Sequence, residues 1–133
     1  MNEDLQNTLF VALGGALGTM FRHLLNVWTF MPTFPVGTVI ENLTGAFALG
    51  VTTGFIAALN SAPKWLRAGV GVGFCGGYTT MSTFAADSFV VTVYQSPLMA
   101  AGYVAVSLVF GLLLAWVGLG VGRQLGERSR RAS

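Results

Sequence analysis

The sequence predicts an all-α integral membrane protein with four transmembrane helices. Charged residues are rare: 7 Lys plus Arg and 5 Asp plus Glu in 133 residues, whereas about a quarter of a soluble domain is charged. Hydrophobic residues make up 53% of the chain. Most of the charges lie near the two ends, which leaves apolar stretches between them. Each stretch of about 20 apolar residues is long enough to cross roughly 30 Å of hydrocarbon.

Four such stretches are expected to be the spans: residues 5–25, 36–59, 66–94 and 98–122. The connections are short, so residues 1–133 form a single domain. The first connection is rich in aromatic residues and proline, which is typical of a turn at the lipid headgroups. The basic tail, residues 123–133, is expected to face solvent and headgroups rather than nucleic acid.

The charges favour one orientation only weakly. Four spans place both termini on the same side, and that side collects six of the seven basic residues. The positive-inside rule then predicts cytoplasmic termini in the inner (plasma) membrane. Without the tail, the side of the termini has two basic residues, Lys64 and Arg67, and the opposite side has one, Arg22. A chain with so small a bias is able to insert both ways up.

Glycine is unusually frequent inside the spans, with 18 in the chain. Several are four residues apart, such as Gly14 with Gly18 and Gly118 with Gly122. This spacing lets helix backbones approach closely in lipid. Four spans of this length enclose no obvious cavity, so a pore or carrier is expected to need more than one copy.

The third stretch is expected to contain a broken helix. Glycines up to Gly77 lead directly into Tyr78 and a run rich in Thr and Ser, where helix propensity is poor. A break inside the bilayer is tolerated where the freed backbone is buried or faces water, and its carbonyls or amides are then available to an ion. The alternative is a kinked helix whose Thr and Ser hydroxyls bond to their own carbonyls.

Neutral hydrogen-bonding groups lie on the neighbouring spans. The second stretch carries Thr38 and Asn42, and the fourth places Tyr103 and Ser107 on one helix face. These groups predict a small ion handled by hydrogen bonds. One cysteine and one histidine are too few for zinc or disulfide chemistry, and no nucleophile, base and orienting group occur together. We therefore expect no enzyme.

Three ordered motifs then resemble one known family. They are GGALGTMFRH (14–23), GTVIENLTGAFALG (37–50) and GFCGGYTTMSTFAAD (73–87). Together they are similar to the Fluc, or CrcB, fluoride channels, over essentially the whole chain. The resemblance implies an antiparallel, dual-topology homodimer with two fluoride pores. It also implies passive export of fluoride that the cell accumulates as the weak acid HF.

The resemblance also assigns roles to residues of this chain. A structural Na⁺ on the dimer axis would be held by the backbone carbonyls of Gly76 and Thr79. Arg22 would be a packing or vestibule residue. The fluoride pore would be formed by a set of donors and ring edges: Asn42, Phe84, Met81, Tyr103, Ser107, Thr38, Ser82 and Thr83.

Two residues depart from the family pattern. Met81 stands where the pattern has a phenylalanine, and a thioether offers no comparable positive ring edge. Glu41 stands beside Asn42, where an aliphatic residue is expected. An ionised carboxylate beside an anion path repels fluoride, so Glu41 is expected to be protonated, paired with a basic group, or turned toward the headgroups.

Two other functions remain open from the residues. A proton-coupled exporter of the small multidrug-resistance type would use Glu41, although that family carries its glutamate in the first helix. A non-conducting membrane subunit would use the glycine faces only for assembly.

Overall fold

A computed structural model describes residues 2–59 and 62–132, and every element in that part of the chain is helical. The long helices are α1 (Glu3–Trp28), α2 (Val36–Ala58), α5 (Met81–Tyr94) and α6 (Pro97–Ala132). The third predicted stretch comprises α3 (Lys64–Leu66), the π-helical segment η1 (Arg67–Cys75), α4 (Gly76–Tyr78) and then α5. The predicted starts of the second and fourth stretches agree with these bounds to within one residue.

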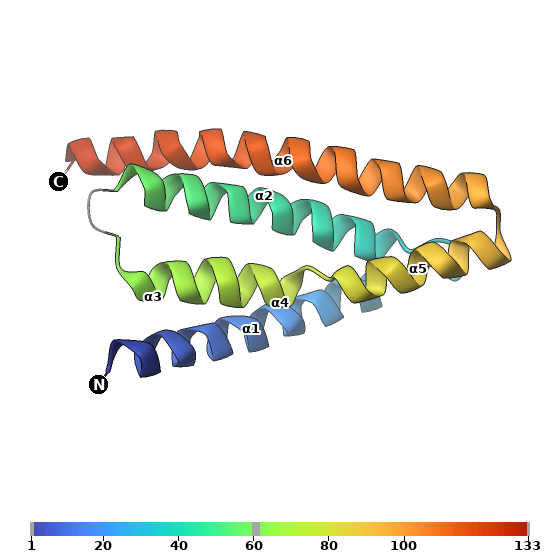
Figure 1. Cartoon of the computed structure of the whole chain (residues 1–133), viewed down its shortest axis with the longest axis horizontal. Coiled ribbons are helices and arrows are strands. Elements are labelled where there is room, and N and C mark those ends of the chain that lie inside the picture. Colours follow the sequence, from blue (N-terminus) through green and yellow to red (C-terminus); the bar gives the residue numbers. More distant parts are fainter. Residues whose placement is uncertain (1, 60–61, 133) are drawn as a thin grey trace.

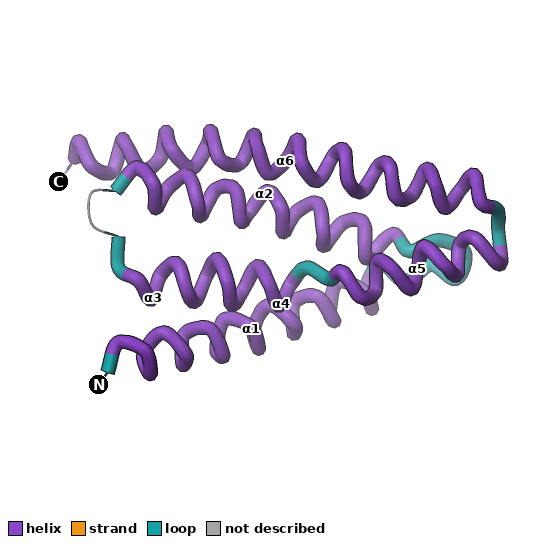
Figure 2. The backbone as a smooth tube through the Cα atoms, viewed as in Figure 1, coloured by secondary structure: helices purple, strands orange, loops and turns teal. Residues whose placement is uncertain are grey.

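The helices run alternately up and down, with both termini at the same end (Figure 1). The chain passes from α1 to α2, returns through α3 to α5, and ends in α6 (Figure 2). As a result α2 and α6 run parallel to each other and pack side by side, and α1 packs against η1 and α4.

Three helices, α1, α2 and α6, are long and apolar enough to cross a membrane. Large apolar side chains cover their outer faces, for example Leu13, Leu112 and Trp116. The chain is therefore a multi-pass membrane protein. At 1.5 Å per residue, the 36 residues of α6 span about 54 Å, which exceeds the hydrocarbon thickness. The basic tail therefore continues α6 as a helix beyond the bilayer core.

Glycines bring the backbones of α2 and α6 into direct contact. A Cβ atom at Gly50 would clash with the carbonyl of Ala115, and one at Gly118 would clash with the carbonyl of Phe47. Gly122 repeats the arrangement one turn later against Val51. The spacing of four residues predicted such packing, and the structure places it within one subunit.

A second close contact joins α1 to η1. A Cβ at Gly14 would meet the carbonyl of Gly69, and one at Gly73 would meet the carbonyl of Val11. At one end of this pair, Lys64 Nζ lies 2.7 Å from Glu3 Oε2. Both side chains are exposed, and the carboxylate raises the pKa of the Lys64 ammonium group. One seam therefore joins α2 to α6, and the other joins α1 to the third segment.

The α2–α6 seam gives a testable expectation. Gly118→Ala should lower the thermal midpoint of the purified protein in detergent, because overpacking costs roughly 1–3 kcal/mol. Gly120→Ala is the matched control: it lies on the same helix, and nothing lies within 4 Å of a Cβ added there. Equal midpoints for the two variants would contradict the packing described.

Candidate functional site

The third segment is interrupted between Tyr78 and Met81. Thr79 (φ −82°, ψ 159°) and Thr80 (φ −144°, ψ 126°) adopt extended backbone conformations. Thr80 is the N-cap of α5, and its side-chain oxygen accepts a hydrogen bond from the Thr83 amide at 3.2 Å. The β-branched pair is suited to this geometry, because it favours extended backbone over helix.

Asn42 on α2 pairs with the extended backbone. Its Oδ1 accepts a hydrogen bond from the Thr80 amide at 2.8 Å, and its Nδ2 donates to the Thr80 carbonyl at 3.0 Å. Both backbone groups of Thr80 are thereby satisfied by one side chain, which replaces the helical bonds lost at the break. One N–H of Asn42 remains for another acceptor.

Helix α1 supports the other side of the break. Thr19 Oγ1 donates to the Gly77 carbonyl at 3.4 Å, and Arg22 Nη1 lies 3.5 Å from the Thr79 carbonyl oxygen. Both contacts are long and therefore weak. Arg22, for which a packing or vestibule role was expected, lies beside the interrupted backbone.

Glu41 is fully buried, with none of its surface exposed. Its Oε2 accepts a hydrogen bond from Asn26 Nδ2 at 2.7 Å. The three surroundings expected for Glu41 stay predictions, and the structure adds a neutral hydrogen-bond partner, Asn26. Nothing in the sequence pointed to Asn26, because the two residues meet only when α1 and α2 pack together.

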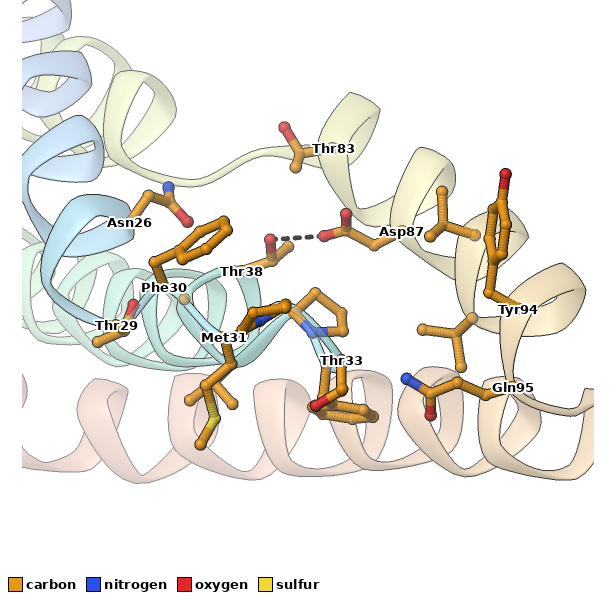
Figure 3. Close-up of a pocket in the computed structure, with 17 residues that line it drawn as sticks. Asn26, Thr29, Phe30, Met31, Thr33, Thr38, Thr83, Asp87, Tyr94 and Gln95 are labelled. Atoms are coloured by element: carbon orange, nitrogen blue, oxygen red, sulfur yellow. Dashed lines mark hydrogen bonds between the residues drawn. The ribbon is translucent and has the colours of Figure 1, made fainter.

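A second polar contact joins α2 to α5. Thr38 Oγ1 donates to Asp87 Oδ2 at 2.6 Å, and this pair lies in the wall of an open cavity of about 600 Å³ (Figure 3). The loop between α1 and α2 forms another part of the wall, including Phe30 and Met31. The cavity therefore combines an apolar rim with a hydrogen-bonded carboxylate.

Tyr103 on α6 is buried between two aromatic rings. Its ring centroid lies 5.3 Å from that of Phe84, and 5.7 Å from that of Phe34 in an edge-on arrangement. Three buried side-chain atoms have no hydrogen-bond partner among the described residues: Glu41 Oε1, the Tyr103 hydroxyl and Ser107 Oγ. Glu41 Oε1 belongs to α2, and the other two atoms belong to α6.

The remaining expected pore residues are on the outside of the single chain. Met81 is 74% exposed at the start of α5, and Ser82 and Thr83 are also exposed. The hydroxyls of Ser82 and Thr83 lie 3.3 and 3.1 Å from Thr80 Oγ1. The structure therefore brings Asn42, Phe84, Tyr103, Ser107 and Thr38 inward, and leaves Met81 at a free surface.

A second open cavity, of about 590 Å³, lies on the side of the break away from α1. Gly76 and Thr79, the residues expected to hold Na⁺, line it together with Gly45 of α2. The Thr80 amide, which would bond to the Gly76 carbonyl in a continuous helix, bonds to Asn42 instead. The Gly76 carbonyl is thereby released from this helical bond, whereas the Thr79 carbonyl lies 3.5 Å from Arg22 Nη1.

Residues 9–119 match the family described as CrcB-like protein, Camphor Resistance (CrcB). The chain is 42% identical to "Fluoride-specific ion channel FluC 2" of Halalkalibacterium halodurans over 132 residues, 98% of this chain and 96% of the relative. It is 42% identical to "Fluoride-specific ion channel FluC 2" of Bacillus subtilis over 121 residues, 91% of each chain. It is 37% identical to "Fluoride-specific ion channel FluC 1" of Staphylococcus aureus (strain NCTC 8325 / PS 47), covering 86% of this chain and 94% of the relative.

The family match over residues 9–119 contains every residue named for the site, including the interrupted segment. The chain belongs to the CrcB family.

Proposed function

We propose that this chain forms a passive, fluoride-selective ion channel that exports fluoride down its electrochemical gradient. The observation that carries the proposal is a set of uncharged donors: the half-buried amide of Asn42, which is bonded to the break at Thr80, and the buried hydroxyls of Tyr103 and Ser107. Among the described residues no Lys or Arg is buried. Relatives at 37–42% identity that are named fluoride-specific ion channels support it.

The chemistry of fluoride suits such donors. Fluoride is small and strongly hydrated, so a pore must replace its water with close hydrogen-bond donors. Amide and hydroxyl groups, and the positive edges of aromatic rings, do this without a fixed cation that would trap the ion. Among the described residues the buried aromatic side chains are Phe84 and Tyr103, and their ring centroids lie 5.3 Å apart.

The conducting unit in this proposal is a homodimer of inverted subunits in the lipid bilayer. The interrupted segment, α3 through α5, serves as the fourth span of each subunit. The weak charge bias supports insertion in both orientations. The exposure of Met81, and the open cavity beside Gly76 and Thr79, support a partner that covers this face. Two copies would bring four carbonyls of Gly76 and Thr79 together around one structural Na⁺.

Two rival functions are a proton-coupled exporter and a non-conducting membrane subunit. A proton-coupled exporter would need Glu41 to be open to its substrate, whereas the side chain is buried and bonded to Asn26. A non-conducting subunit would have no need of the unpartnered hydroxyls of Tyr103 and Ser107.

The direct test is anion efflux from liposomes loaded with potassium salts. After valinomycin is added, native protein should release fluoride roughly 100-fold faster than chloride or more, since such a ratio needs only about 3 kcal/mol. Protein-free liposomes with the same treatment give the background. Chloride released as fast as fluoride, or fluoride release no faster than background, would overturn the channel assignment.

Met81 should limit the rate. Met81→Phe restores an aromatic edge, whose interactions are worth roughly 0.5–1.5 kcal/mol, so fluoride efflux should rise roughly two- to tenfold. Met99→Phe makes the same change at another exposed position and should leave efflux unchanged. Slower or unchanged efflux in Met81→Phe would show that the thioether of Met81 does not limit the rate of fluoride efflux.

A further inference from the structure

Helix α6 reaches further than its neighbours at the end of the molecule where both termini lie (Figure 1). Helix α2 ends at Ala58, and a Cβ added at Gly126 of α6 would lie 2.7 Å from the Ala58 Cβ. Every residue from Glu127 to Ala132 is exposed. Residues 123–132, the α6 arm, therefore end beyond the part of α6 that packs on α2.

The length of α6 places the start of the arm at the membrane surface. Residues 97–122 carry no charge and are about 39 Å long at 1.5 Å per residue. That length exceeds the roughly 30 Å of hydrocarbon but not the roughly 40–45 Å of the whole bilayer. Arg123, the first charged residue of α6, therefore lies among the lipid headgroups.

The arm carries a net positive charge, part of it on a face turned away from α2. It contains four arginines, and Glu127 is its only acidic residue. Gly126 faces α2, and successive helical residues are about 100° apart, so Arg128 and Arg131 lie about 160° and about 140° from it. Both arginines are exposed. They are three residues apart, so their like charges repel unless an anion lies beside them. This face therefore fits an anionic partner.

The depth of the arm favours phospholipid over a dissolved anion or nucleic acid. Arg128 is about 7.5 Å further along the helix than Arg123, which is within the Debye length of about 8 Å at physiological salt. Side chains on a helix tilt toward its N-terminus, so these arginines lean back toward the bilayer. A guanidinium group binds phosphate through two parallel hydrogen bonds, and anionic lipids add a net negative charge that zwitterionic lipids lack.

We propose that the α6 arm binds the headgroups of anionic phospholipids through Arg123, Arg128 and Arg131. The chain therefore gathers such lipids at the end of the bundle where its termini lie. In a pair of inverted subunits, each membrane surface would carry one arm. The inference does not rest on the proposed channel function, because it needs only a chain that spans the membrane.

The test measures lipid association in phosphatidylcholine liposomes that contain native protein and a trace of spin-labelled lipid. The motionally restricted fraction of the electron paramagnetic resonance spectrum is compared for labelled phosphatidylglycerol and labelled phosphatidylcholine. Native protein should prefer phosphatidylglycerol roughly twofold or more at low salt, because basic residues beside a membrane attract anionic lipid. The preference should disappear at roughly 1 M KCl, where the Debye length is about 3 Å.

Variants locate the preference on the arm. Combined Arg123→Gln, Arg128→Gln and Arg131→Gln should remove most of it, and Arg128→Gln alone should lower it. Lys64→Gln is the matched control: it also removes one positive charge near this end of the bundle, but Lys64 is already paired with Glu3 at 2.7 Å. Its preference should stay native. Arg128→Gln should keep the native thermal midpoint in detergent, because Arg128 is exposed.

Four results would overturn the proposal. They are equal association of the two labelled lipids with native protein, a preference that persists in the triple variant, a preference that persists at roughly 1 M KCl, and an equal loss in Lys64→Gln and Arg128→Gln. Loss of the preference when inorganic phosphate replaces chloride at the same ionic strength would assign the arginines to free phosphate. Displacement of labelled lipid by a duplex oligonucleotide would assign them to nucleic acid. Fluoride efflux is measured separately, so its absence would overturn the channel function and leave this result unchanged.

Discussion

The pairing of Asn42 with the backbone of Thr80 is the interaction on which the site depends. A helix interrupted inside a bilayer exposes backbone groups that no water can satisfy, and each unsatisfied group costs several kcal/mol. One amide side chain satisfies both groups of Thr80, with contacts of 2.8 and 3.0 Å. The extended backbone of Thr79 and Thr80 persists because Asn42 on α2 supplies the hydrogen-bond partners that the broken helix lacks. The same contact releases the Gly76 carbonyl from its expected helical partner.

The glycine seams make this pairing possible. Asn42 reaches Thr80 only if α2 is held at a fixed depth and rotation, and Gly50 and Gly118 set both by backbone contact with α6. On the other side, the contact of Gly14 with Gly69 holds α1 against the segment that leads into the break. Close packing of small residues thus positions polar groups that lie several turns away. The proposed fluoride path follows from this arrangement, because its donors Asn42, Tyr103 and Ser107 lie on the packed helices α2 and α6.

The sequence was informative where local chemistry decides the structure. Apolar length predicted where α2 and α6 begin, and the four-residue glycine spacing predicted close helix contact. The predicted end of the last span, residue 122, differs from the structure, in which α6 continues to Ala132. The contacts that depend on how separate helices pack could not be read from the chain. Asn26 against Glu41 and Thr38 against Asp87 join residues 15 and 49 positions apart, with no local pattern to pair them. The sequence also marked Glu41 as anomalous, but only packing revealed its buried position and its free oxygen.

The central claim is that Asn42 holds the break in a form that conducts fluoride. The most direct measurement compares valinomycin-dependent fluoride efflux for Asn42→Ala and for Gln124→Ala, an amide removed from an exposed position on the same fold. Loss of both bonds to Thr80 leaves backbone groups unsatisfied, so Asn42→Ala should reduce efflux roughly 100-fold or more, while Gln124→Ala keeps the native rate. Native efflux in an Asn42→Ala protein that remains folded would contradict this account.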